Sequence, residues 1–220
     1  MFTSIVFDLI SKIKGKTILC TKKINENIYT VQCGYVNFYI YHKNSCFICF
    51  DAGFNTKLIY RELNKLNIDP YNISQIFLTH SDYDHYDGIK IFANSKVHIS
   101  KEEILMIKKG IHRPFGLNKK SKEIEQMYQI NDGEIIKLED IKIECILTPG
   151  HTYGSMSYLV DGKYLFLGDS CNIQYNEIKP LKKYINMNQN MHNISINKIK
   201  KINNVSMSFV GHSGYRIAND

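Results

Sequence analysis

One short segment, residues 78–88 with the sequence LTHSDYDHYDG, constrains the fold of this chain more than any other. Four side chains that can bind metal ions fall within six residues there, namely His80, Asp82, Asp84 and His85. The mainly apolar run 73–78 leads directly into them and is typical of a buried strand. The segment therefore predicts a metal site at the point where a strand passes into a loop.

Three turns in the second half of the chain carry residues of the same kind. His151 lies in TPGHT, Asp169 in GDS and His212 in GHSG, and each turn follows an apolar, strand-like run. Together the two halves supply enough imidazole and carboxylate ligands for two divalent ions. The candidate ligands are His80, Asp82, Asp84, His85, His151, Asp169 and His212. The other histidines are interpreted as ordinary core or surface residues; they are His42, His98, His112 and His192.

Strands and helices are expected on both sides of these turns. In the first half, the predicted strands are 17–20, 27–32, 35–41, 46–50, 73–78 and 96–100, and the predicted helices are 56–66, 87–92 and 101–109. In the second half, the predicted strands are 134–138, 141–147, 155–160, 164–167 and 206–210, with a helix at 194–202. Two such halves packed face to face would bring all the ligand-bearing strand ends to one edge of the molecule.

Length and composition favour a single globular domain over residues 1–220. No run approaches the roughly 18 apolar residues of a membrane span, and residues 1–10 lack the early basic region of a signal peptide. The six cysteines lie in apolar segments, which predicts reduced thiols and a cytoplasmic protein. Cys46 and Cys49 would point to opposite faces of one strand, so we interpret both as packing residues.

The net charge of +7 comes mostly from lysine, since the chain has only three arginines, Arg61, Arg113 and Arg216. The lysines are spread along the sequence and form no basic stripe with aromatic residues between them, which argues against a nucleic-acid partner. Most of them are expected on a solvated surface. The expected partner is a small molecule, and an anionic one suits the charge.

The motifs resemble, in order and along nearly the whole chain, those of the metallo-β-lactamase superfamily. They are DAG at 51–53, THSDYDH at 79–85, TPGHT at 148–152, GDS at 168–170 and GH at 211–212. The resemblance implies an α/β fold, the αββα sandwich, in which two mixed β-sheets are flanked by helices and a dinuclear metal site lies at one edge.

The resemblance also implies a role for each ligand. His80, Asp82 and His151 would hold the first metal, Asp84, His85 and His212 the second, and Asp169 would bridge them. Asp51 would lie behind the ligands as a residue that orients them.

The activity implied is that of a dinuclear metal-dependent hydrolase. A hydroxide bridging the metals would attack a small ester, thioester, lactone or phosphodiester, so no serine or cysteine nucleophile is needed. Asp84 is the predicted catalytic residue, because it binds the second metal and can also orient the hydroxide. The alternative is a non-hydrolytic protein of the same fold, either a di-iron redox protein or a metal-binding sensor.

Asp82 departs from the family motif H-x-H-x-D-H, which has histidine at this position. The added carboxylate lowers the formal charge of the site by about one unit, which weakens its Lewis acidity and favours harder metals. We therefore expect two divalent ions, most readily zinc, with manganese or iron admitted by Asp82. Our hypothesis is that Asp82 is a true ligand of the first metal, because every other ligand position is intact.

The substrate cannot be read from the ligands, because the residues that select it lie on loops. The expected walls are residues 110–130, a candidate lid, and residues 171–190. Arg113 and the lysine cluster at 119–122 are candidates for holding an anionic group. Lactonase activity is disfavoured, because the tyrosine that the family's lactonases place three residues after the bridging aspartate is Asn172 here.

Overall fold

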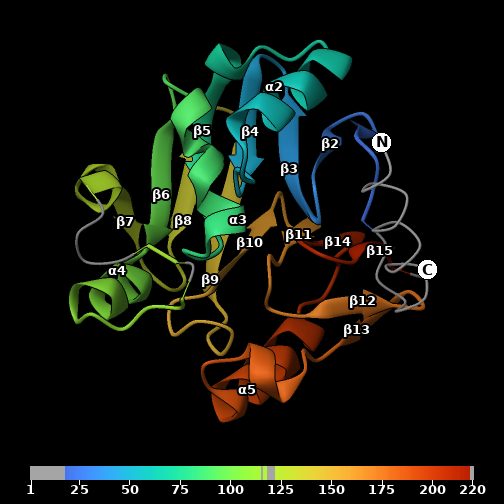
Figure 1. Ribbon diagram of the computed structural model, residues 1–220. Coiled ribbons are helices and arrows are strands. Elements are labelled where there is room, and N and C mark those ends of the chain that lie inside the picture. Colours follow the sequence, from blue (N-terminus) through green and yellow to red (C-terminus); the bar gives the residue numbers. More distant parts are fainter. Residues whose placement is uncertain (1–17, 115, 118–121, 219–220) are drawn as a thin grey trace, which may run out of the picture.

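The computed structural model describes residues 18–114, 116–117 and 122–218. Two mixed β-sheets are covered by helices, as Figure 1 shows. The α-helices are α2 (Thr56–Lys65), α3 (Tyr83–Tyr86), α4 (Lys101–Lys108) and α5 (Gln189–Lys200). Short 3₁₀ helices lie at Pro70–Asn72, Asp87–Ile91, Lys122–Gln126 and Lys183–Ile185.

The first sheet has seven strands in the order β1-β2-β3-β4-β5-β6-β7. They are β1 (Lys22–Lys23), β2 (Ile28–Cys33), β3 (Val36–Lys43), β4 (Cys46–Phe50), β5 (Ile73–Phe77), β6 (Lys96–Ser100) and β7 (Tyr128–Ile130). Neighbours from β1 to β4 are antiparallel, whereas those from β4 to β7 are parallel. Because Phe50 pairs with Phe77, the segments carrying Asp51 and His80 leave the sheet at the same edge.

The second sheet has six strands in the order β15-β14-β11-β10-β9-β8. They are β8 (Ile135–Leu138), β9 (Ile141–Leu147), β10 (Met156–Val160), β11 (Tyr164–Phe166), β14 (Met207–Val210) and β15 (Gly214–Ile217). Only β11 and β14 are parallel neighbours, with Phe166 opposite Phe209. The turns carrying Asp169 and His212 therefore emerge together. A separate hairpin is formed by β12 (Asn172–Gln174) and β13 (Glu177–Lys179).

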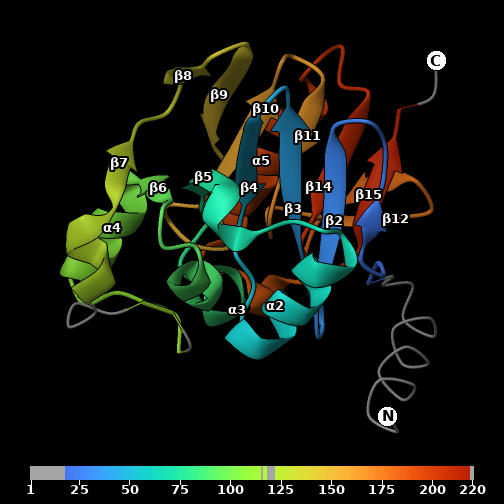
Figure 2. The same ribbon diagram turned by 90° about the horizontal axis from the view of Figure 1, so that it is seen from above.

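Three hydrophobic clusters hold the layers together. Side chains alternate along β3, so that Phe38 and Ile40 join the cluster under α2 while Tyr39 and Tyr41 join the cluster between the sheets. The third cluster lies between α5 and the outer face of the second sheet. Figure 2 shows the two sheets stacked, with α2 and α3 beside the first sheet. These layers confirm the αββα sandwich with two mixed sheets.

Most of the predicted elements are present, and the strands at 46–50, 96–100 and 141–147 have the predicted bounds. The strand predicted at 17–20 is wrong, because residues 18–20 form no strand and residue 17 lies outside the described residues. The helix predicted at 194–202 begins earlier, at Gln189. There the Asn188 side chain accepts a hydrogen bond from the backbone N–H of Met191 and caps the helix.

Smaller features can also be compared with the sequence. The helix predicted at 87–92 is the 3₁₀ helix Asp87–Ile91, and the β12–β13 hairpin was not predicted. Cys46 packs on the cluster between the sheets and Cys49 belongs to the cluster under α2, as expected of opposite faces. Within the described ranges, no helix has both the length and the apolar character needed to cross a bilayer.

Candidate metal centre

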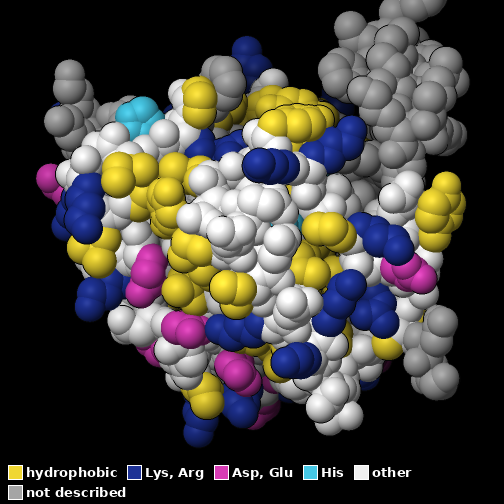
Figure 3. Space-filling view, turned by 90° about the horizontal axis from the view of Figure 1, so that it is seen from below, with side chains coloured by type: hydrophobic (Ala, Val, Ile, Leu, Met, Phe, Trp, Pro, Cys, Tyr) yellow, Lys and Arg dark blue, Asp and Glu magenta, His cyan; other side chains and the backbone are white. Residues whose placement is uncertain are grey.

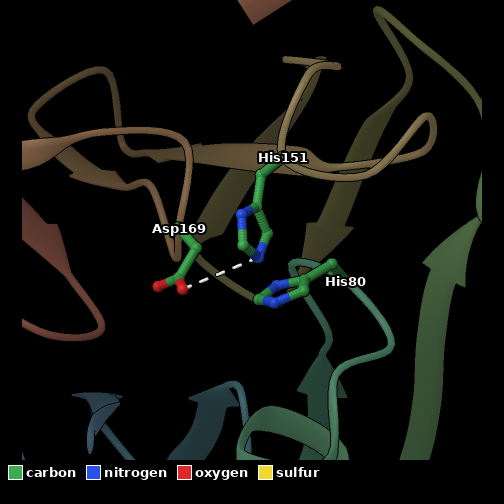
Figure 4. Close-up of side chains that lie close together, drawn as sticks. All are labelled: His80, His151 and Asp169. Carbon is green, nitrogen blue, oxygen red and sulfur yellow. Dashed lines mark ion pairs between the residues drawn. The ribbon is translucent and has the colours of Figure 1, made fainter. Parts of the chain in front are cut away.

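The first of two ligand groups consists of His80, His151 and Asp169, whose ligand atoms all lie within 4.8 Å of one another. His80 follows β5 of the first sheet, while His151 and Asp169 follow β9 and β11 of the second. Figure 4 shows the three side chains converging from the two sheets. The Nε2 atom of His151 lies 3.7 Å from Oδ2 of Asp169. The group therefore exists only because the two sheets are packed together.

The second group consists of Asp84, His85 and His212, again with ligand atoms within 4.8 Å of one another. Asp84 and His85 lie on the single turn of α3, and His212 lies in the turn between β14 and β15. His212 Nε2 is 3.3 Å from Asp84 Oδ2, and His85 Nε2 is 3.9 Å from the same oxygen. Both groups thus combine residues that are far apart in the sequence.

Asp169 contacts both groups. Its Oδ1 lies 3.5 Å from His85 Nε2, and its Oδ2 lies 3.3 Å from His212 Nε2 as well as near His151. A Cβ atom on the neighbouring Gly211 would come within 2.8 Å of Asp169 Oδ1. The backbone therefore approaches this carboxylate closely, and Asp169 occupies the position between the two groups.

The donor atoms fit divalent cations. His80 Nε2 and His85 Nε2 are buried, and neither has a hydrogen-bond partner among the described residues. The opposite ring nitrogens are occupied, since His80 Nδ1 lies 3.0 Å from Thr79 Oγ1 and His85 Nδ1 lies 2.7 Å from Asp51 Oδ2. Ligands at about 2.0–2.1 Å from a tetrahedral ion stand about 3.3 Å apart. The separations of 3.3 to 3.9 Å at the second group are close to that value.

Asp51 lies behind the ligands. Its carboxylate is buried and accepts hydrogen bonds from the backbone N–H and the hydroxyl of Thr79, at 2.7 and 2.9 Å. The residue has a left-handed backbone, with φ of 62°, directly at the end of β4. Asp51 therefore fixes both the start of the ligand loop and the ring of His85, and it belongs to neither ligand group.

Burial and the neighbouring charges shift the pKa values of the ligand side chains. Burial opposes ionisation of Asp169, but His212 and His85 outweigh it and hold the pKa of that carboxyl well below its usual value. Burial likewise opposes protonation of His85, yet Asp51 and Asp169 raise its pKa to about 9. Burial lowers the pKa of His151 to about 4. The Asp169 carboxylate is therefore ionised at neutral pH, and its charge attracts cations to the same cluster of nitrogen atoms.

Asp82 faces the first group from the start of α3. Its Oδ2 lies 3.3 Å from His151 Nε2 and 3.7 Å from His80 Nε2. The same oxygen accepts a 2.6 Å hydrogen bond from Nε of Arg113, a partner that the sequence did not indicate. The hypothesis that Asp82 is a metal ligand stays a prediction, and the three ligand atoms of the first group meet without it.

Glu103 connects the two ligand-bearing loops of the first group. Its fully buried carboxylate accepts hydrogen bonds from the backbone N–H and the hydroxyl of Ser81, next to His80, at 3.0 and 2.5 Å. It also accepts hydrogen bonds from the Thr152 hydroxyl and the Gly154 N–H, at 2.7 and 3.1 Å. Acidic residues are common in the first turn of a helix, so nothing in the sequence distinguished Glu103.

A cavity of about 440 Å³ opens over both groups. It is lined by Tyr35, Asp82, Tyr83, Asp84, Arg113, His151, Asp169, Asn172, Leu181, Ile185 and His212. Tyr35 was not anticipated, because it lies in the turn between β2 and β3, far from any ligand motif. Its ring stacks on His212 at a centroid distance of 5.9 Å, and its carbonyl accepts a 2.8 Å hydrogen bond from His212 Nδ1.

The predicted walls contribute unequally to this cavity. Residues 171–190 provide Asn172, Leu181 and Ile185, whereas the candidate lid at 110–130 provides Arg113. Of the lysine cluster at 119–122, only Lys122 is among the described residues, and it does not line the cavity. Figure 3 views the face that carries α5 and shows lysine and arginine scattered there among acidic and apolar side chains.

Comparison with known proteins agrees with this geometry. The profile described as the metallo-beta-lactamase superfamily matches residues 31–181. A probable metallo-hydrolase of Methanocaldococcus jannaschii is 29% identical over 157 residues, covering 71% of this chain and 65% of that protein. A probable polyketide biosynthesis zinc-dependent hydrolase of Bacillus subtilis is 29% identical over 126 residues, covering 56% and 48%. The chain thus matches about half to two thirds of the length of these relatives.

The fold is also similar to that of solved structures. One of them, described as a B3 metallo-beta-lactamase with an active-site glutamic acid, has a TM-score of 0.71. The two sequences are 18% identical, and the match covers 96% of this chain and 87% of the other. At this identity the match shows that the two proteins share a fold.

Proposed function

The chain belongs to the metallo-beta-lactamase superfamily, and we propose that it is a hydrolase that uses two divalent metal ions on a small ester, thioester, lactone or phosphodiester. The observation that carries the proposal is the position of Asp169 between the two sets of ligand atoms: its Oδ2 lies near His151 as well as His212, and its Oδ1 lies near His85. A carboxylate placed in this way suits two ions that share one substrate.

The proposed ligands of the first ion are His80, His151 and Asp82, and those of the second are Asp84, His85 and His212. Asp169 would be shared. Two bound ions would supply Lewis acidity, which would make a water molecule nucleophilic near neutral pH and would polarise a carbonyl or phosphoryl oxygen. Zinc is the proposed metal, supported by the imidazole-rich ligand set and by the zinc-dependent Bacillus relative. Because the carboxylate of Asp82 favours harder metals, manganese and iron are the alternative metals that we propose.

Asp84 and Tyr35 are the side chains that we propose to act directly on the water and the substrate. Asp84 lines the cavity and is ionised, because the neighbouring His85 and His212 outweigh its burial and lower its pKa. It can therefore accept a proton from the attacking water. Burial and the nearby Asp84 raise the pKa of Tyr35 to about 12, so its phenol stays protonated and can donate a hydrogen bond to a substrate oxygen.

The cavity supports a small substrate. Its volume of about 440 Å³ lies at the lower end of the range of roughly 300–1,000 Å³ for small-molecule sites. Leu181 and Ile185 offer an apolar wall, and Asn172 offers an amide. An ester or thioester with an apolar part matches these surfaces.

A screen of the purified protein with zinc, manganese or iron tests the proposal. The substrates are p-nitrophenyl esters, an acyl thioester, a homoserine lactone and bis-p-nitrophenyl phosphate, and each is also offered to Asp84→Asn. We expect turnover of at least one substrate and a loss of at least about 100-fold in the variant. Equal activity of Asp84→Asn and the parent protein would contradict the proposed role of Asp84.

The alternative of a non-hydrolytic di-iron or sensor protein is kept because of the carboxylate at Asp82. Metal analysis of the protein as purified separates the two. Two irons with visible absorbance, reversible redox change and no turnover in the screen would support the alternative over the hydrolase.

A further inference from the structure

We propose that Arg113 is a positioning residue for the first metal site, which holds the Asp82 carboxylate toward His80 and His151 and offsets the charge that this aspartate adds. The inference rests on the proposed two-metal function. It explains how the side chains of the first ligand group stay correctly oriented although residue 82 is an aspartate and not the histidine of the family motif.

A single oxygen of Asp82 carries the contacts. Oδ2 accepts the 2.6 Å hydrogen bond from Arg113 Nε and faces His151 Nε2 at 3.3 Å and His80 Nε2 at 3.7 Å. The other oxygen, Oδ1, is buried and has no hydrogen-bond partner among the described residues. The guanidinium and the two histidines therefore share one oxygen, and Arg113 holds the carboxylate against the first ligand group.

Arg113 is itself held in place. Its Nη1 donates a 2.6 Å hydrogen bond to the Ile185 carbonyl, and the side chain is only 23% exposed. The loop that carries it is fastened beside Asp82, because Leu117 N donates a 2.9 Å hydrogen bond to the Ser81 carbonyl. A Cβ on Gly116 would lie 3.1 Å from that same carbonyl oxygen, so the two segments are closely packed. The guanidinium is thus fixed before any ligand binds.

The charge of the pair suits the site. Among the described residues that line the cavity, Asp82, Asp84 and Asp169 are acidic, and Arg113 is the one arginine or lysine. Asp82 adds a negative charge where the family motif has a neutral imidazole, and Arg113 returns one positive charge to the same oxygen. The two residues therefore act together as a substitute for one histidine, and Arg113 has this role only while residue 82 is an aspartate.

A double-mutant cycle tests this dependence on residue 82. The proteins are the parent chain, Arg113→Gln, Asp82→His and the double variant, and the readouts are zinc affinity by chelator competition and the visible spectrum of the cobalt-substituted protein. In the parent background, Arg113→Gln is expected to weaken zinc binding at one of two sites by about 10- to 100-fold and to change the cobalt spectrum. In the Asp82→His background, the same change is expected to alter the affinity by less than about twofold.

The conservative variant Arg113→Lys keeps the charge without the planar fork, and partial recovery of zinc affinity relative to Arg113→Gln is expected. Circular dichroism checks that each variant is folded. An equal loss of affinity in both backgrounds would overturn the inference, because Arg113 would then act only by tying its loop to Ile185. Unchanged zinc affinity with a raised KM for anionic substrates would also overturn it, in favour of a substrate-binding role. Failure of the parent protein to bind two ions would refute the proposed function itself, whereas the other two outcomes would leave that function intact.

Discussion

His85 and Asp51 form a buried pair, with Nδ1 of the imidazole 2.7 Å from Oδ2 of the carboxylate. The contact joins the end of β4 to the turn of α3, and it directs the other nitrogen of the ring toward Asp84 and Asp169. A pair of this kind sets the tautomer of a metal-binding histidine and makes it a stronger ligand.

Replacement of Asp51 by asparagine should weaken the second metal site. The amide keeps the shape of the side chain but loses the charge that favours His85 as a ligand, so zinc affinity at one site is expected to fall about 10- to 100-fold. Chelator competition measures the change. Asp140→Asn, at an exposed position before β9, is the matched control and should leave zinc affinity unchanged. A fully active Asp51→Asn site with parental affinity would contradict the orienting role.

Asp169 and His80 should differ in the number of ions that depend on them. Asp169 faces both ligand groups, so Asp169→Asn is expected to reduce zinc content from about two ions per chain to below about one. His80 belongs to one group, and His80→Ala should retain about one ion. Atomic emission after dialysis against buffered zinc measures both. The same zinc content in the two variants would show that Asp169 is not shared.

Loss of the Glu103 carboxylate should destabilise the whole protein. In Glu103→Ala, buried donors of Ser81, Thr152 and Gly154 lose their acceptor, and the free energy of unfolding is expected to fall by about 3 kcal/mol or more. Urea denaturation of the metal-depleted protein isolates this effect from metal binding. The exposed Glu125 provides the control, and Glu125→Ala should change stability by less than about 0.5 kcal/mol. Equal stabilities of the two variants would refute the prediction.

Buried His98 should make the protein less stable in mild acid. Burial and the nearby Lys96 lower its pKa from 6.5 to about 4. Between these two pH values His98 is protonated in the unfolded chain but neutral in the folded chain. Stability is therefore lost as pH falls from about 6.5 toward 4. Between pH 7 and pH 5 this effect is expected to lower the free energy of unfolding by about 1–2 kcal/mol.

The variant His98→Phe removes the titrating group while keeping an aromatic ring against Phe77, whose centroid lies 4.7 Å away. Its unfolding free energy should change less than that of the parent protein between the two pH values, whatever its absolute stability. Exposed His112 serves as the comparison, and His112→Gln should keep the parental pH dependence. The same pH dependence in His98→Phe as in the parent would assign the acid sensitivity to other groups.

Much of the fold could be predicted from the sequence, because its strands are short and sharply bounded by polar turns. The segment 46–50 is apolar and ends at Asp51, and 141–147 ends at the turn that carries His151. Elements without such boundaries were harder to predict. The start of α5 depends on one capping asparagine, and the β12–β13 hairpin has strands of three residues each, too short to show a period.

The sequence by itself determined the candidate ligands, because each stands at a strand end beside a glycine or a turn and in a motif shared with the family. The segment from His80 to His85 places four of them on one strand exit. It also marked Asp82 as the departure from the family motif. These features are local, and a local pattern is sufficient to recognise them.

Only the tertiary structure decided what surrounds those ligands. Arg113 contacts Asp82, which lies 31 residues earlier in the sequence. Glu103 joins Ser81, in a loop of the first sheet, to Thr152, in a loop of the second sheet. Tyr35 stacks on His212, 177 residues later in the sequence. Such contacts depend on how loops and sheets pack, and no periodicity or spacing of the residues involved encodes them. The metal-binding motif can therefore be recognised in the sequence, whereas the residues that orient its ligands and balance their charge emerge only when the two sheets are assembled.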